Sequence, residues 1–253
     1  MDINTRTNDH QTLRRMSFDF NFVKQASSSS LFQLDYKTKI SCAVYGPRAN
    51  VKDLNEFSEK CRIVCDVKFA PFATKGERRG RGGRSAYEEE ISNLLEQALT
   101  AGVCLDKYPK CVINVYIIVL EDDGNVLGAA ITAASLTLIM AGVECYDLVL
   151  GISASVTNKK QNKDTTTSNA KNDNNQHQQL ILDSNAEEEE NATGSMIVAY
   201  MPNLEKVNVW HVVGKMDGKN AADGLNACIN KCNEIHLFAK QTLENHSQYQ
   251  LTS

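Results

Sequence analysis

The chain has 253 residues, 42% of them hydrophobic and 23% charged, with a formal net charge of −4. This composition is ordinary for a globular protein with a sizeable core, and it excludes a chain that is basic throughout, so any nucleic-acid contact must be local. The N-terminal MDINTRTNDHQ lacks the apolar centre of a signal peptide. We therefore expect an unsecreted protein with reduced thiols.

From the N-terminus, residues 1–26 are polar and patternless, which predicts a disordered or loosely attached arm. LFQLDY and ISCAVYGPR follow as a hairpin, and RIVCDVKF alternates like a half-buried strand, for which we expect antiparallel pairing. After the glycine- and arginine-rich stretch 75–84, SAYE predicts a capped helix over 85–102, with Ser85 as the cap and Glu88 closing a capping box.

CVINVYIIVL is apolar on both faces and predicts a central strand. An apolar run follows and predicts a buried helix over 126–141, because its length and its Thr and Ser residues do not suit a bilayer span. The next predicted strand is DLVLGISASV, and residues 158–179 form a polar insertion after it. The remaining predicted strands are LILD, SMIVAYM and KVNVWHVV. A helix over about 221–244 closes the chain.

This order predicts an α+β fold with helices packed on a mostly antiparallel sheet, rather than a doubly wound α/β fold. We expect one domain over 27–247 and a short tail over 248–253.

The eight cysteines include no C-x-x-C pair, and most lie in apolar runs. Cys228, Cys232 and His236 have helical spacing that suits three metal ligands, but a fourth ligand is not evident and core residues have the same spacing. We therefore expect buried thiols, with no metal and no cofactor.

The stretch LEDDGNVLGAAITAAS reads as the end of a strand, a tight acidic turn and the start of a helix. Proteins often hold phosphate in this layout, because free backbone N–H groups and the helix dipole point at the turn. The side chains at this turn therefore decide whether an enzyme or a structural relative of one is encoded.

Four stretches together resemble the RNase PH family, which includes ring subunits of the eukaryotic RNA exosome. They are SSSSLFQLDYKTKISCAVYGPR, CDVKFAPFATKGERRGR, LDKYPKCVINVYIIVLEDDG with AAITAASLTLIMAGVECYDLVLG, and ILDSNAEEEENATGSMIVAYMP. The resemblance implies the RNase PH-like fold, a ribosomal protein S5-like β-α arrangement. The family's usual R-P-D-G-R opening is absent, and the insertion over 158–179 is not part of the common core.

Active members of this family cleave the 3′ nucleotide of RNA with inorganic phosphate, which they hold with Gly-Thr-Arg at the strand–turn–helix junction. The matching positions here are Asn125, Val126 and Leu127, and the family's later acidic residue matches Ser195. Because phosphate beside a polyanion requires fixed, charged donors, these residues predict that no phosphorolysis occurs. The nearby acidic run 187–190 is interpreted as a solvated loop.

The stretch KGERRGRGGR can follow a phosphodiester backbone by charge, or it can pair with an acidic neighbouring subunit. Its candidate RNA-binding residues are Lys75, Arg78, Arg79, Arg81 and Arg84. The resemblance implies a noncatalytic subunit in a heterohexameric ring, with RNA-binding cap subunits and an RNA substrate, in the nucleus, nucleolus and cytoplasm. The alternatives are an active phosphorolytic exoribonuclease and a stand-alone RNA chaperone.

Overall fold

The computed structural model describes residues 13–35, 37–49, 59–74, 85–158 and 178–252. The strands are β1 (Met16–Phe20), β2 (Ser28–Leu34), β3 (Thr38–Ala49), β4 (Arg62–Phe69), β5 (Cys111–Glu121), β6 (Leu150–Asn158), β7 (Gln178–Leu182), β8 (Gly194–Met201) and β9 (Lys206–Gly214). The helices are α1 (Ala86–Gly102), the short 3₁₀ helix η1 (Leu105–Lys107), α2 (Val126–Met140), α3 (Ala186–Glu190) and α4 (Gly218–Thr252).

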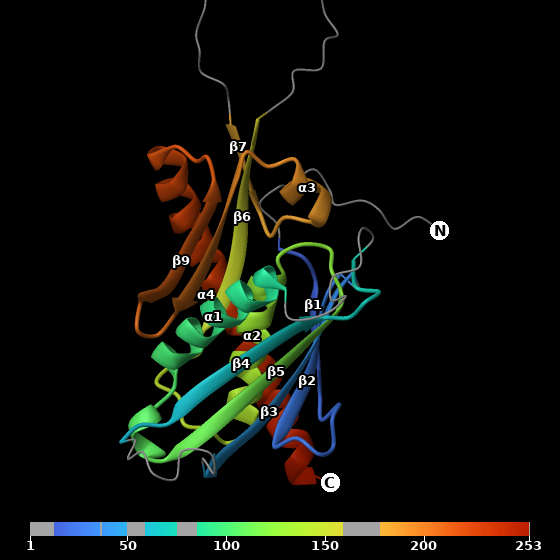
Figure 1. Ribbon diagram of the computed structural model, residues 1–253, viewed down its shortest axis with the longest axis vertical. Coiled ribbons are helices and arrows are strands. Elements are labelled where there is room, and N and C mark those ends of the chain that lie inside the picture. The colour runs from blue at the N-terminus through green and yellow to red at the C-terminus, as the bar shows by residue number, and fades with distance from the viewer. Residues whose placement is uncertain (1–12, 36, 50–58, 75–84, 159–177, 253) are drawn as a thin grey trace, which may run out of the picture.

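A five-stranded sheet has the order β1-β2-β3-β5-β4, and a four-stranded sheet has the order β7-β6-β8-β9. Figure 1 shows the five-stranded sheet in the lower half of the molecule and the four-stranded sheet in the upper half. Strands and helices thus combine in the α+β architecture that the sequence predicts, and among the strands of the described residues every pair except one is antiparallel.

The exception is β4, which pairs parallel to β5, so the antiparallel pairing expected for RIVCDVKF is wrong. The physical reason is the connection between the two strands. Because α1 lies between β4 and β5 in the chain, it can carry the chain back along the sheet, as a parallel pair requires.

The expectation of a loose arm up to residue 26 is wrong for the described residues after 12. β1 pairs antiparallel with β2, with Phe18 opposite Phe32. The Phe18 ring stacks on Phe32 with centroids 4.4 Å apart and also contacts Phe238 of α4. The alternating MSFDF is a short strand signal whose apolar side chains are held by this aromatic contact.

Helix α2 packs against strands of both sheets. Its residues from Val126 to Leu138 are buried on every side, which confirms the predicted buried helix. None of the described helices is long and apolar enough to span a membrane.

The predicted hairpin is β2–β3, the predicted capped helix is α1, and the closing helix, α4, begins before and continues beyond the range expected for it. In α1 the Glu88 carboxylate accepts a hydrogen bond from the Ser85 N–H at 3.1 Å, as in a capping box. Both ends of the insertion predicted over 158–179 are wrong, because Asn158 belongs to β6 and Gln178 and Gln179 belong to β7, which pairs with it. Residues 159–177 lie outside the described part of the chain.

Candidate functional site

The junction between β5 and α2 is the place where the resemblance puts a phosphate site. Asn125 caps α2 in a left-handed conformation, with φ 53°, and is 5% exposed. Its side-chain NH₂ donates to Asp183 Oδ1 at 2.7 Å, and its backbone N–H donates to Glu189 Oε1 at 2.9 Å. Both donors of this residue are therefore already directed at carboxylates of the same chain.

Asp183 forms a buried ion pair with Arg14, whose Nη2 lies 2.8 Å from Oδ1 of the carboxylate. The Arg14 backbone N–H donates to Oδ2 at 3.0 Å, and Nη1 donates to the Asp123 carbonyl oxygen at 2.9 Å. Burial by itself raises the pKa of the Asp183 carboxyl, but the charge of Arg14 and the hydrogen bonds from Arg14 and Asn125 outweigh it and hold the pKa below its ordinary value. Arg14 thus neutralises Asp183 and ties β1 to the turn.

Glu189 places a second carboxylate at the start of α2. Besides the Asn125 N–H, its Oε1 accepts a hydrogen bond from Ser184 Oγ at 3.2 Å, and Ser184 Oγ lies 2.8 Å from Ser155 Oγ. Burial raises the pKa of the Glu189 carboxyl above its ordinary value, although these two hydrogen bonds oppose the rise. An intramolecular anion therefore occupies the end of the helix that attracts anions.

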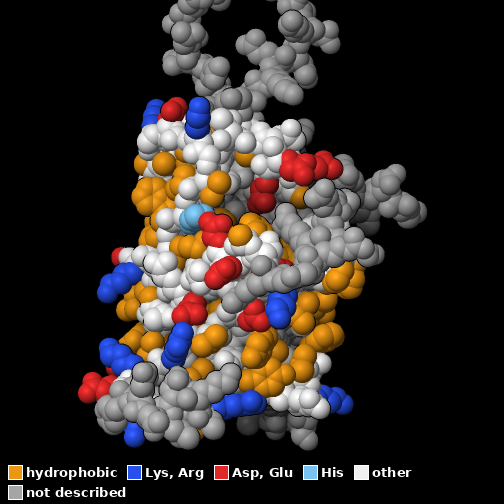
Figure 2. All heavy atoms as spheres, viewed as in Figure 1, with side chains coloured by type: hydrophobic (Ala, Val, Ile, Leu, Met, Phe, Trp, Pro, Cys, Tyr) orange, Lys and Arg blue, Asp and Glu red, His pale blue; other side chains and the backbone are white. Residues whose placement is uncertain are grey.

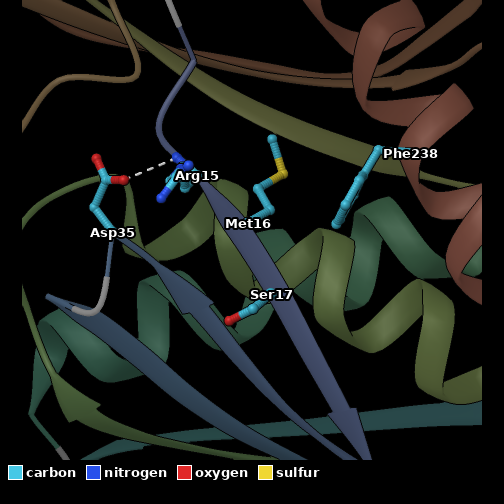
Figure 3. A pocket seen from close by; sticks show the side chains of 5 residues that line it. All are labelled: Arg15, Met16, Ser17, Asp35 and Phe238. Carbon is cyan, nitrogen blue, oxygen red and sulfur yellow. Dashed lines mark hydrogen bonds between the residues drawn. The ribbon is translucent and has the colours of Figure 1, made fainter.

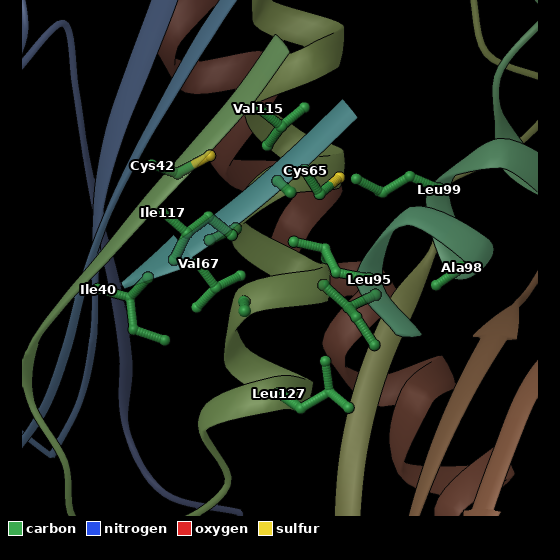
Figure 4. Close-up of a cluster of buried hydrophobic side chains, with 14 of the residues drawn as sticks. Ile40, Cys42, Cys65, Val67, Leu95, Ala98, Leu99, Val115, Ile117 and Leu127 are labelled. Carbon is green, nitrogen blue, oxygen red and sulfur yellow. The ribbon is translucent and has the colours of Figure 1, made fainter. Parts of the chain in front are cut away.

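Val126 and Leu127 lie in the hydrophobic core. They are 5% and 3% exposed, and both belong to the larger hydrophobic cluster. Figure 4 shows Leu127 of α2 at the lower edge of this cluster, below Leu95 of α1. A cavity beside Asn125 measures about 10 Å³, which suits roughly one water molecule and is too small for phosphate.

Ser195, the match to the family's acidic residue, lies on β8 directly opposite Ser155 of β6. Residues opposite each other in an antiparallel pair share a face, so Ser195 lies beside the chain of hydrogen bonds that runs from Ser155 through Ser184 to Glu189. The structure therefore brings the 125–127 and 195 positions to one region, in which the hydrogen bonds from Ser155 through Ser184 and Glu189 reach Asn125.

The five candidate RNA-binding residues all fall in 75–84 and lie outside the described residues. On the face seen in Figure 2, the Lys and Arg side chains of the described residues are scattered among Asp and Glu. A separate pocket of about 410 Å³ lies between β1 and α4, lined by Arg15, Met16, Ser17, Asp35 and Phe238 (Figure 3). It offers one carboxylate and one guanidinium, and Met16 also lines the small cavity beside Asn125.

Cys228 and Cys232 are fully buried in the core under α4. Burial raises the pKa of the Cys228 thiol to about 12 and that of Cys232 further, so both are neutral thiols at neutral pH. Within the described part of the chain, no group of three or more His, Cys, Asp or Glu residues has metal-site geometry.

Sequence reasoning missed two residues of this region. Arg14 stands in a polar stretch without a pattern, and nothing in the sequence marks its distant partner. Glu189 belongs to the acidic run interpreted as a solvated loop, but that run forms α3, and this one side chain turns toward α2. The capping signal Asn185–Glu188, which fixes α3 through hydrogen bonds of 2.8 and 2.9 Å, was the available clue.

The sequence of residues 12–144 matches the RNase PH family, described as "3′ exoribonuclease family, domain 1". The chain belongs to the RNase PH family.

Among relatives, the human exosome complex component MTR3 is 36% identical over 161 residues, which are 59% of this chain and 58% of that protein. The exosome complex component Rrp41 of Pyrobaculum neutrophilum is 31% identical over 235 residues, covering 92% of this chain and 86% of the relative. The alignment thus spans less than two thirds of human MTR3.

The crystal structure of rice Rrp46 superposes with a TM-score of 0.75 at 22% identity, covering 94% of this chain and 98% of that one. At this identity the match shows the fold, and it extends over nearly the whole chain. The RNase PH-like fold predicted from the sequence is therefore confirmed.

Proposed function

We propose that this RNase PH family member is a noncatalytic subunit of an RNA exosome ring, supporting 3′-to-5′ processing and degradation of RNA, including rRNA maturation and mRNA turnover. Its partners are other RNase PH-like subunits in a heterohexameric ring, RNA-binding cap subunits and RNA that threads the channel. It works in the nucleus, the nucleolus and the cytoplasm, and it needs no cofactor.

The observation that best supports this function lies at the start of α2, where the Glu189 carboxylate accepts a hydrogen bond of 2.9 Å from the Asn125 N–H. Phosphorolysis requires a doubly charged nucleophile held by cationic donors, and a second anion at this place repels it. The side chains of Val126 and Leu127 are apolar and buried, so they offer no replacement donor.

The names of the relatives support the assembly. MTR3 and Rrp41 are both called exosome complex components, and the rice chain of the same fold is Rrp46. The basic residues Lys75, Arg78, Arg79, Arg81 and Arg84 would then meet RNA, or an acidic neighbour, without reading its sequence.

A phosphorolytic exoribonuclease is the second candidate, because the family itself is described as a 3′ exoribonuclease family. It would require the chain to hold phosphate with groups other than residues 125–127.

The test is to incubate the purified chain with 3′-labelled RNA and inorganic phosphate and to measure nucleoside diphosphate release together with RNA binding. We expect no diphosphate, weak RNA binding by the isolated chain, and co-purification with other RNase PH-like subunits. Diphosphate release that persists after repurification, and that is lost on omission of phosphate, would establish the enzyme instead. Tight binding of RNA by the isolated chain would favour the chaperone.

A further inference from the structure

Strand β9 ends the four-stranded sheet, and its backbone is paired with β8 on one side only. Every second residue of such a strand directs its N–H and C=O groups away from the sheet, where they can pair with another strand. The residues 207–213 read VNVWHVV, with no Lys, Arg, Asp, Glu or Pro to discourage that pairing. The pairing with β8 skips Asn208 at a bulge near the start of β9, and from 209 to 213 the edge has neither a bulge nor the charged residues or prolines that usually protect edge strands.

The other edge of comparable length is protected. On β4, the Val67 N–H donates to Ser92 Oγ and the Phe69 N–H donates to Glu88 Oε1, each at 3.0 Å. Both acceptors belong to α1, so this helix covers the edge. The two remaining edges, β1 and β7, have five residues each, against nine in β9. In the described chain, the long exposed edge is thus β9.

Apolar side chains are exposed on both faces of β9. Val209 packs in the core and His211 lies 3.5 Å from Glu90 of α1, so beyond the bulge at Asn208 the face of Val209 and His211 is the one toward α1. Val213 shares that face and is 54% exposed, while Trp210 and Val212 on the opposite face are 51% and 41% exposed. Figure 1 shows β9 at the outer side of its sheet.

The exposure of apolar side chains on both faces of β9 indicates which kind of partner can cover this strand. A protein surface or a nucleic acid that lies on one face would leave the other face exposed, and a phosphodiester backbone does not pair with a strand edge. A strand added beside β9 contacts the backbone and, through its own alternating side chains, the apolar residues of both faces.

We propose that β9 is an assembly surface onto which a neighbouring RNase PH-like subunit adds a β-strand, with Trp210 as the side-chain anchor. This inference rests on the proposed function, because it takes its partner from the ring. The addition buries the exposed tryptophan and valines, and large aromatic residues of this kind commonly carry much of the energy of an interface.

Trp210 is the chain's only tryptophan, so 5-fluorotryptophan labelling gives one ¹⁹F resonance. The labelled chain is mixed with the unlabelled RNase PH-like subunits of the same organism, and co-elution is followed in parallel. We expect the resonance to shift and its solvent-isotope effect to fall on assembly. We also expect Trp210→Lys and Val213→Lys to lower the affinity for one neighbour by at least about tenfold.

Leu237→Lys is the matched control, because Leu237 is 63% exposed and lies on α4. Circular dichroism and melting curves establish that each variant folds, which half-exposed positions should allow. Co-elution with an unchanged resonance, or equal loss in the control, overturns the strand addition and leaves the ring function standing. Failure of the unaltered chain to co-elute with any of these subunits overturns both.

Discussion

Glu189 illustrates two opposing effects on one side chain. The Asn125 N–H and the positive end of the α2 dipole stabilise its ionised form, while burial penalises that form. Because the folded-state pKa is raised, the stability contributed by the protonated form is complete below the ordinary pKa and is lost as the pH rises through the folded value. At neutral pH the ionised carboxylate therefore destabilises the fold relative to a neutral acceptor.

Glu189→Gln should consequently unfold at a higher denaturant concentration than the unaltered chain at pH 7. The difference should shrink as the pH falls below the raised pKa of Glu189, because the native side chain then becomes neutral as well. Glu189→Ala should instead lose about 1–3 kcal/mol, since the Asn125 N–H is left without its acceptor.

Urea titrations between pH 4 and pH 8 measure these differences, with the exposed neighbour Glu190→Gln as the control. A Glu189→Gln variant whose advantage grows toward acid pH would show that the carboxylate is stabilising as an anion.

Asp183 has the opposite linkage. Its folded-state pKa is lowered, so its contribution to stability is present above the ordinary value of about 3.9 and is lost as the pH falls through the folded value. Asp183→Asn leaves the Arg14 guanidinium buried without a counter-charge. We expect a loss of about 3–5 kcal/mol at pH 7, measured by chemical denaturation, and a smaller loss near pH 3. Equal losses at both pH values would contradict the ion pair as the cause.

The sequence predicts the roles of some residues at the junction between β5 and α2 and gives no sign of the roles of others. Val126 and Leu127 can be recognised in advance, since their side chains supply no donor whatever the fold. The roles of Arg14 and Glu189 cannot be recognised in advance, because they depend on partners that are distant in the sequence. Arg14 and its partner Asp183, for example, are 169 residues apart. Local propensity and spacing carry no information about such a pair.

At the scale of elements, α2 and β6 meet backbone to backbone. A Cβ on Gly151 would lie 2.7 Å from the Gly128 carbonyl oxygen and 2.8 Å from its Cα. The Gly151 N–H also donates to Thr132 Oγ1 at 3.0 Å across the same contact. The absence of side chains at these two glycines lets the helix approach the four-stranded sheet this closely.

Gly151→Ala should therefore destabilise the protein by about 1–3 kcal/mol, because backbone atoms must move apart to admit the methyl group. Gly218→Ala is the matched control, since a Cβ there would meet no atom within 4 Å apart from its own chain neighbours and helix backbone, and the change should stay within about 0.5 kcal/mol. Equilibrium denaturation of both variants gives the comparison. A neutral Gly151→Ala would mean that the two elements separate without cost.

The long elements were predictable because a local signal marks them. α1 has helical spacing with a capping box, and α2 has an unbroken run of apolar and small residues. β1 was missed because five residues preceded by a polar stretch carry little signal. Its existence depends on the Phe18–Phe32 contact, which forms only after the chain has folded back.

At the scale of the whole molecule, the fold class followed from the order of strands and helices, but one pairing direction did not. The strand–helix–strand order of β4, α1 and β5 is itself the pattern of a parallel crossover, and the alternation of RIVCDVKF hid it. Alternation indicates that one face is buried, and it does not indicate the direction of the neighbouring strand. The predicted bounds of 27–247 are too narrow, because β1 pairs with β2 before residue 27 and α4 continues through the predicted tail to Thr252. That the chain is a single domain stays a prediction.

The position of α2 between the two sheets has a consequence for how the protein comes apart. A helix whose residues from Val126 to Leu138 are all buried has no side that faces water in the folded protein, so detaching either sheet exposes a largely apolar surface and breaks the hydrogen bonds of Thr132 and Ser135 or of Thr137. Partial opening is therefore strongly disfavoured. The amide hydrogens of α2 should exchange with solvent only when the entire polypeptide unravels, and both layers should melt together as one cooperative unit.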